Sequence, residues 1–281
     1  MTTAPAPAHI PTGEAAAAAL QGALEQTDTP LLEVQNLQMR FGGLLAVDAL
    51  SLQVRAGQIV SLIGPNGAGK TTVFNCLTGF YKPSGGRILL RGESIGGLPG
   101  HAIARRGVVR TFQNVRLFRD MTVVENLLVA QHRHLNRSYL AGLLKTPSFR
   151  RSEREALHAA GQWLERMHLL EVANRPAGTL PYGQQRRLEI ARCMMTRPTL
   201  LMLDEPAAGL NPHETAELET LIGQLRDEFS LTVLLIEHDM RLVMSISDYI
   251  YVINQGRPLA QGTPQQVREH PDVIKAYLGE D

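Results

Sequence analysis

The most specific chemical pattern in this chain is GPNGAGKT, residues 64–71. A polyphosphate needs many donors on a concave surface, and glycines let the backbone curl so that successive N–H groups point inward. Lys70 can reach the β- and γ-phosphates, and the Thr71 hydroxyl can hold Mg²⁺. A helix that starts here adds its positive N-terminal end. The stretch therefore predicts a site for a nucleoside triphosphate.

Two carboxylates, Asp204 and Glu205, directly follow the apolar run LLML. In α/β sheets, ligands bind at the carboxyl ends of the strands, and Mg²⁺ prefers oxygen ligands. Adjacent side chains of a strand point to opposite sides, so one carboxylate can meet the metal while the next orients water. We predict that Asp204 contributes to the metal site and that Glu205 acts on water.

A histidine follows a second apolar run, TVLLIE. A histidine at the end of a buried strand can contact a γ-phosphate, and we predict this role for His238. The alternative is a capping or surface histidine. The two patterns described above favour the functional interpretation.

These residues need an α/β framework to position them. Apolar runs predict strands at 31–41, 50–54, 58–64, 86–92, 199–206 and 231–239, with a hairpin around Gln255–Gly256. Helical patterns cover 71–80, 211–229 and 263–278, where Asn211 and Thr263 are predicted N-caps. Such alternation predicts a mostly parallel sheet with helices on both faces.

The middle of the chain has a different sequence pattern. From Thr122 to about Leu170 the pattern is helical, with an interruption near Leu144–Ser148. Ser152–Glu155 has the form S-x-x-E and predicts a capping box at the start of the second helix. We expect an α-helical subdomain inserted between two halves of the α/β core.

Composition excludes several classes of protein. The net charge of +1 gives no support to a nucleic-acid binder. Cys76 and Cys193 lie far apart, which predicts reduced, buried thiols and a cytosolic compartment. No stretch is long and apolar enough for a membrane helix. Residues 1–30 read as a disordered Ala/Pro-rich extension, with a transient helix at Glu14–Gln26, and not as a signal peptide.

In this order, the motifs resemble those of the ATP-binding cassette (ABC) family, from Leu31 to the C-terminus. Residues 64–71 match the Walker A loop, and Gln113 in RTFQNVRLF matches the Q-loop. Asp204 and Glu205 match the Walker B aspartate and the catalytic glutamate. The match also covers the switch histidine, the aromatic residue that stacks on adenine and a valine near it: His238, Phe41 and Val47.

The resemblance implies an α/β fold: a RecA-like P-loop ATPase core at 31–281 with an antiparallel β subdomain, a helical subdomain at about 114–194 and a C-terminal tail at about 258–281. It implies ATP and Mg²⁺ as cofactors. Catalysis would fall to Glu205, His238 and Lys70, and metal binding to Thr71, Gln113 and Asp204. Nucleotide contacts would come from Phe41, Val47, Gly64, Pro65, Asn66, Gly67, Ala68, Gly69, Lys70, Thr71, Thr72, Gln113, Gly183 and Gln184.

One segment departs from the family pattern. LPYGQ, residues 180–184, stands where the signature LSGGQ is expected, and in this family that loop closes over ATP held by a second cassette. Pro181 replaces a serine and offers neither a hydroxyl nor an N–H. Asn211 likewise stands where an aspartate usually ends the D-loop. These departures leave open whether two paired sites are equally active, and Pro181→Ser is expected to raise ATPase activity.

Within the family, segments such as LPYGQQRRLEIARC and LDEPAAGLNP resemble the ATPase subunit of branched-chain amino acid importers. The resemblance implies a second ATPase subunit, two permeases, a periplasmic substrate-binding protein and a peripheral position on the cytoplasmic side of the inner membrane. We expect Val115, Leu117 and Phe118 to contact a permease; the alternative is packing within the helical subdomain. Other candidates are importers of urea or short amides, lipopolysaccharide exporters, and soluble ABC ATPases. The sequence leaves the solute and homo- or heterodimeric pairing open.

Overall fold

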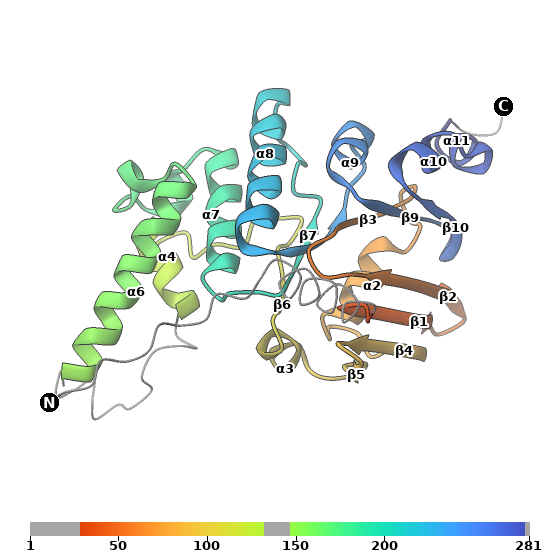
Figure 1. The fold of residues 1–281 in the computed structure, drawn as a ribbon, viewed down its shortest axis with the longest axis horizontal. Coiled ribbons are helices and arrows are strands. Elements are labelled where there is room, and N and C mark those ends of the chain that lie inside the picture. The colour runs from red at the N-terminus through yellow and green to blue at the C-terminus, as the bar shows by residue number, and fades with distance from the viewer. Residues whose placement is uncertain (1–28, 132–146, 279–281) are drawn as a thin grey trace, which may run out of the picture.

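Figure 1 shows the fold in a computed structural model, which describes residues 29–131 and 147–278. Nearly all of the predicted N-terminal extension, and most of the predicted interruption near Leu144–Ser148, lie outside the described residues. Within them, the strands form two sheets, one of four strands and one of six. The division into subdomains remains a prediction.

The smaller sheet has the order β2-β1-β4-β5, and all of its pairs are antiparallel. Its strands are β1 (Leu32–Phe41), β2 (Leu44–Val54), β4 (Gly85–Leu90) and β5 (Glu93–Ser94). The sequence pattern placed the start of β2 at residue 50, which is wrong by six residues. The strand begins at Leu44 because Leu44 and Leu45 pair with Phe41 and Arg40 directly across the turn at Gly42.

The larger sheet confirms the predicted parallel core. Its order is β10-β9-β3-β8-β7-β6, and only β10 runs antiparallel to its neighbour. The strands are β3 (Ile59–Ile63), β6 (Val108–Arg110), β7 (Leu200–Asp204), β8 (Thr232–Ile236), β9 (Tyr249–Asn254) and β10 (Arg257–Gly262). Every residue of β3, β7 and β8 is buried, which explains their continuous apolar sequences.

Helices cover both faces of this sheet, and alternate residues of β7 show it. Leu200 and Met202 pack into a core shared with α2 (Lys70–Leu77) and the smaller sheet. Leu201 and Leu203 pack into a second core shared with α7 (Tyr182–Met194) and α8 (Pro212–Phe229). Figure 1 shows α8 and α9 (Met240–Ile246) on the face opposite α2.

The helical part lies at one end of the molecule in Figure 1, where α4 (Val123–Ala130) and α6 (Pro147–Arg166) stand beside α7. The predicted capping box at Ser152–Glu155 is wrong. α6 already starts at Pro147, and the Ser152 hydroxyl donates a hydrogen bond to the Phe149 carbonyl inside the helix. A capping box forms instead at the start of α4, between Thr122 and Glu125.

The remaining short elements complete the chain. They are α3 (Gly100–Arg105), η2 (Leu170–Val172), η3 (Ala177–Thr179), α10 (Pro264–Arg268) and α11 (Pro271–Leu278). The predicted capping boxes of α8, Asn211 with Glu214, and of α10, Thr263 with Gln266, are confirmed. The hairpin at Gln255–Gly256 is also confirmed: both residues have positive φ, as a two-residue turn requires.

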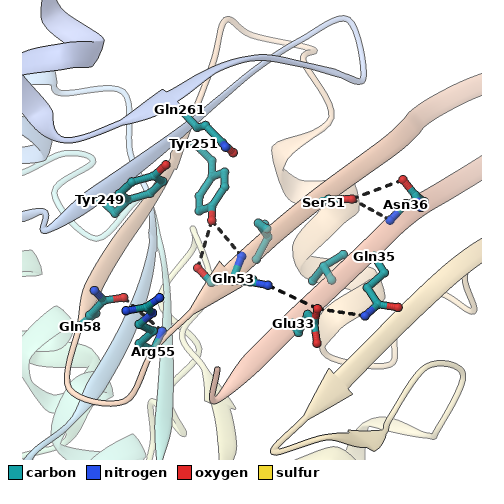
Figure 2. Close-up of a pocket in the computed structure, with 12 residues that line it drawn as sticks. Glu33, Gln35, Asn36, Ser51, Gln53, Arg55, Gln58, Tyr249, Tyr251 and Gln261 are labelled. Carbon is teal, nitrogen blue, oxygen red and sulfur yellow. Dashed lines mark hydrogen bonds between the residues drawn. The ribbon is translucent and has the colours of Figure 1, made fainter. Parts of the chain in front are cut away.

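A cavity of about 680 Å³ opens between the two sheets, away from the predicted site residues. Figure 2 shows that its polar side chains largely satisfy one another. The Tyr251 hydroxyl accepts a hydrogen bond from the Gln53 N–H, and Glu33 accepts bonds from Gln35 and Gln53. None of the residues that line it is a predicted site residue.

Both cysteines are free and buried, as expected. Burial raises the pKa of the Cys76 thiol to about 11 and that of Cys193 to about 12. Among the described helices, none has the length and apolar character needed to cross a bilayer.

Candidate functional site

The predicted phosphate loop connects the C-terminal end of β3 to the N-terminus of α2. At Gly64 and Gly69 the backbone passes so close to other chain segments that a side chain cannot fit. A Cβ would lie 2.1 Å from the Ile253 carbonyl oxygen at Gly64, and 2.7 Å from the Ala46 carbonyl oxygen at Gly69. α2 has no side-chain cap, so the N–H groups of its first turn are available to an anion.

Lys70, the first residue of α2, is buried and reaches back across the loop. Its Nζ donates hydrogen bonds to the carbonyl oxygens of Gly64, at 2.6 Å, and Pro65, at 3.0 Å. Burial lowers the pKa of Lys70, and the carboxylates of Glu205 and Asp204 act in the opposite direction. The ammonium group therefore lies close to both predicted carboxylates.

The side chains of Asp204 and Glu205 point in different directions, as predicted. The cause is a turn of the backbone at Glu205 and not the alternation of side chains along a strand. Asp204 ends β7 with its side chain buried. Glu205 has a φ of 46°, in the left-handed region, so the strand ends there. Its Oε2 accepts a hydrogen bond of 2.8 Å from Gln113 Nε2 and lies 3.9 Å from His238 Nδ1. The structure thus brings three predicted residues together.

A third carboxylate, Glu237, was missed by the sequence reasoning and fixes this arrangement. Its side chain has no exposed surface. It accepts hydrogen bonds from the backbone N–H groups of Ala207, at 2.7 Å, and His238, at 3.0 Å. Glu237 therefore ties the turn after Glu205 to the turn that carries His238. The signal was available, because a carboxylate directly follows the buried run TVLLI.

Arg110, on β6, was also missed. Its guanidinium group donates to the Asp204 carboxylate and to Asn75 Oδ1, the latter at 2.7 Å. It lies 5.3 Å from the ring centres of both Phe74 and Phe112. Only long-range pairing of β6 with β7 brings Arg110 to Asp204, so local pattern could not reveal it.

The residues predicted to flank adenine differ in their exposure. Phe41, at the end of β1, is 41% exposed and meets Tyr81 edge-on at 5.2 Å between ring centres. Val47 has no exposed surface and packs behind Gly69. Val47 therefore supports the loop from within the core and presents no surface of its own to a ligand.

The signature segment forms the start of α7. Pro181 is the N-cap and supplies no side-chain hydrogen bond, so the first N–H groups of α7 have no side-chain acceptor. A Cβ at Gly183 would lie 2.6 Å from Glu214 Oε1, so a larger residue there would require the Glu214 side chain to move. Among the described residues, no hydrogen bond or ion pair joins Gly183 or Gln184 to the 64–71 loop. Within the described part of one chain, the signature segment and the phosphate loop thus make no direct polar contact.

The donor set fits a nucleotide and Mg²⁺. The loop offers a glycine cradle, an uncapped helix start and a lysine, all of which favour phosphate. Thr71 is exposed, and Asp204 lies at the end of β7, which β8 separates from the strand β3 that leads into the loop. Such oxygen ligands suit Mg²⁺. No group of three or more His, Cys, Asp or Glu side chains in the described ranges could hold a metal alone. The remaining ligands would come from phosphate and water.

Comparison with known families agrees with this geometry. Residues 47–208 match the family model described as ABC transporter. Residues 257–281 match a second model, described as branched-chain amino acid ATP-binding cassette transporter. The chain belongs to the ABC transporter family, and it is an ATPase of that family.

Curated relatives match nearly all of the chain. The high-affinity branched-chain amino acid transport ATP-binding protein BraF of Pseudomonas aeruginosa is 74% identical over 251 residues, which are 89% of this chain and 98% of BraF. The corresponding protein LivG of Escherichia coli is 69% identical over the same shares. The lipopolysaccharide export system ATP-binding protein LptB of E. coli is 34% identical.

Solved structures confirm the fold class. A nucleotide-free ATP-binding cassette from an ABC transporter superimposes with a TM-score of 0.77 at 32% identity, covering 89% of this chain and 100% of that one. A cassette in its ADP conformation gives the same TM-score and identity. The predicted P-loop ATPase core is thereby confirmed.

Proposed function

We propose that this chain is the ATP-hydrolysing subunit of an importer for branched-chain amino acids. The observation that carries the proposal is the 74% identity to BraF, which extends over 98% of that relative. The match of residues 257–281 to the branched-chain amino acid model supports the same solute class. Identity to LptB is only 34%, less than half of the identity to BraF, which favours an importer over a lipopolysaccharide exporter.

In the proposed reaction, the predicted phosphate, water and metal ligands have separate tasks. The 64–71 loop and the start of α2 bind the phosphates, and Lys70 neutralises charge at the transferred phosphoryl group. Glu205 orients the attacking water, Gln113 holds the Glu205 carboxylate in place, and His238 contacts the γ-phosphate. Mg²⁺ would be held by Thr71, Gln113 and Asp204, and would supply Lewis-acid stabilisation of phosphate charge.

The proposed site needs a second cassette. Because Gly183 and Gln184 make no polar contact with the phosphate loop of their own chain within the described residues, we assign their N–H groups to ATP held by a partner cassette. The closed, ATP-bound pair would interact more favourably with one conformation of the transporter than with the other. Only such a difference in interaction free energy can shift the equilibrium between the two conformations. The chain would act on the cytoplasmic face of the membrane, as a peripheral subunit of a complex that also contains two permeases and a substrate-binding protein.

The proposed permease contact is the loop that follows Gln113. Phe118 is 48% exposed, as a docking residue should be, and lies 5.8 Å from the Arg192 guanidinium. Leu117 packs instead against the helical core, as the alternative interpretation anticipated. We therefore assign the contact to Phe118 and give Leu117 a supporting role.

The test is affinity purification of tagged Glu205→Gln protein from native membranes in mild detergent with ATP, followed by mass spectrometry. The proposal expects two permeases, a second cassette and a binding protein that binds leucine, isoleucine or valine. Recovery with ribosomes or DNA, or with a binding protein that takes urea or a short amide, would reject it.

A further inference from the structure

A buried ion pair on α7 lies outside the nucleotide site and contacts the loop that carries Gln113. Arg186 and Glu189 are one turn apart, each has a side chain only 1% exposed, and Arg186 Nη1 lies 2.9 Å from Glu189 Oε2. An ion pair this deeply buried is weak evidence for stability, since desolvation offsets most of the attraction. Its contacts indicate another role.

The guanidinium group of Arg186 holds two consecutive carbonyl groups of the loop. Nη1 donates to the Phe112 oxygen and Nη2 to the Gln113 oxygen, both at 2.7 Å. Glu189 adds a third contact, because its Oε1 accepts from the Arg116 N–H at 3.1 Å. Two side chains of α7 therefore fix the loop backbone on both sides of Gln113.

The hydrogen bonds of Arg186 link the contact between Gln113 and Glu205 to the signature segment. At one end, Gln113 Nε2 donates to Glu205 Oε2 at 2.8 Å. At the other, Arg186 Nη2 donates to the Tyr182 hydroxyl at 3.0 Å, and Tyr182 is the residue that replaces a signature glycine. The Tyr182 ring also lies 3.4 Å from the Cβ position of Gly209, in the turn that follows Glu205.

We propose that Arg186, supported by Glu189, is a positioning residue that couples the signature end of α7 to the contact between Gln113 and Glu205. A displacement of α7, such as pairing with a second cassette would produce, then moves Gln113 relative to Glu205. This inference rests on the roles proposed above for Gln113 and Glu205.

The alternative is a purely structural ion pair, and a double-mutant cycle separates the two. ATPase kcat, KM for ATP and thermal midpoint would be measured on the full chain in its co-purified complex. The variants are Arg186→Met, Gln113→Ala, the double variant, and Arg166→Met as a control. Arg166 forms an exposed ion pair with Glu228, and these residues lie at the C-terminal ends of α6 and α8, at the opposite end of α8 from its N-cap Asn211.

We expect Arg186→Met to lower kcat by about ten- to a hundredfold, the range usual when a group that supports a reacting residue is lost. KM should stay within about twofold, and the double variant should be no slower than Gln113→Ala alone, because both changes break one connection. Arg166→Met should match the wild type.

The inference would be overturned if the kcat losses of the two single variants multiply in the double variant. It would also be overturned if the kcat loss of Arg186→Met is explained by a lower thermal midpoint. Either result would overturn only the inference and leave the site assignment intact. A Gln113→Ala variant with wild-type kcat would overturn both. If Arg186→Met does not fold, Arg186→Lys replaces it: lysine keeps the charge but cannot hold two carbonyls with a planar fork. The expected kcat loss and the same cycle then apply.

Discussion

Glu205 is set apart from its neighbours by its backbone as well as by its partners. Its left-handed φ of 46° ends β7, and its carboxylate meets Gln113 and His238 while Asp204 meets Arg110. A non-glycine residue in this region is held there by its surroundings, and such strain gathers at functional sites. Two adjacent carboxylates thereby receive different partners and different tasks.

Removing the charge of Glu205 tests its task. Glu205→Gln keeps the side-chain shape but cannot act on water as a base, so kcat for ATP hydrolysis should fall about 10²–10⁴-fold. ATP binding, measured with a fluorescent analogue, should remain within about threefold of the wild type because the loop and Lys70 are untouched. Hydrolysis at the wild-type rate would remove Glu205 from the reaction.

Pro181 is the residue whose replacement should improve the enzyme. It is the exposed N-cap of α7 and lacks both an N–H and a hydroxyl. Pro181→Ser should raise kcat about two- to tenfold if the new groups add one hydrogen bond of about 0.5–1.5 kcal/mol to the reacting phosphate. Pro181→Ala, which restores only the N–H, should give a smaller gain. An unchanged rate in the serine variant would refute the idea.

At the scale of elements, many site residues occupy the end of a strand or the start of a helix, while Gln113 lies in the loop after β6. Lys70 begins α2, Asp204 ends β7 and Asn211 caps α8. Strand ends and helix starts meet at one edge of the parallel sheet, so residues distant in sequence converge there. The N-caps fix where the helices begin, and the start of each helix fixes the positions of its first side chains.

Asn211 offers a direct test of this dependence. Its side chain accepts the Glu214 N–H in a capping box, so Asn211→Ala should lower the free energy of unfolding by about 1 kcal/mol. Asn211→Asp, which also caps, should stay within a few tenths of the wild type. Urea titration at constant slope measures both. Equal midpoints for alanine and asparagine would show that the cap does not stabilise α8.

Local pattern predicted the elements better than the contacts between them. Buried runs such as LLML and TVLLI revealed their strands, because strands covered on both faces must be apolar throughout. The short strand β6 has no such run, and Arg110 becomes part of the site only through its pairing with β7. Ser152 failed as a cap because S-x-x-E also occurs inside a helix, where the serine bonds backward.

At the scale of the whole molecule, the nucleotide loop and the signature helix pack on different cores of one sheet. The nucleotide loop packs on the core that contains the smaller sheet, while the signature helix packs on the core that contains α4 and α6. Arg110, Gln113 and Arg186 connect the two regions near β6. These contacts connect the helical part to the two carboxylates.

The buried cysteines report on the integrity of both cores, since Cys76 belongs to one and Cys193 to the other. With pKa values of about 11 and about 12, the folded thiols stay protonated at pH 9, where unfolded thiols ionise. Iodoacetamide at pH 9 should therefore modify neither cysteine until urea unfolds the chain. Stability should fall as the pH rises above 9, because only the unfolded state then loses protons. Rapid modification of the folded protein, read by mass spectrometry, would contradict this packing.

Uptake in living cells tests the central claim, that hydrolysis at this site drives import of branched-chain amino acids. Cells that lack the gene for this chain would receive the wild type, Glu205→Gln or Arg166→Met, and initial uptake of labelled leucine would be measured at equal expression. We expect uptake with the wild type and with Arg166→Met, and loss of uptake with Glu205→Gln. Uptake by Glu205→Gln at the wild-type rate, or no restoration by the wild type, would contradict the claim.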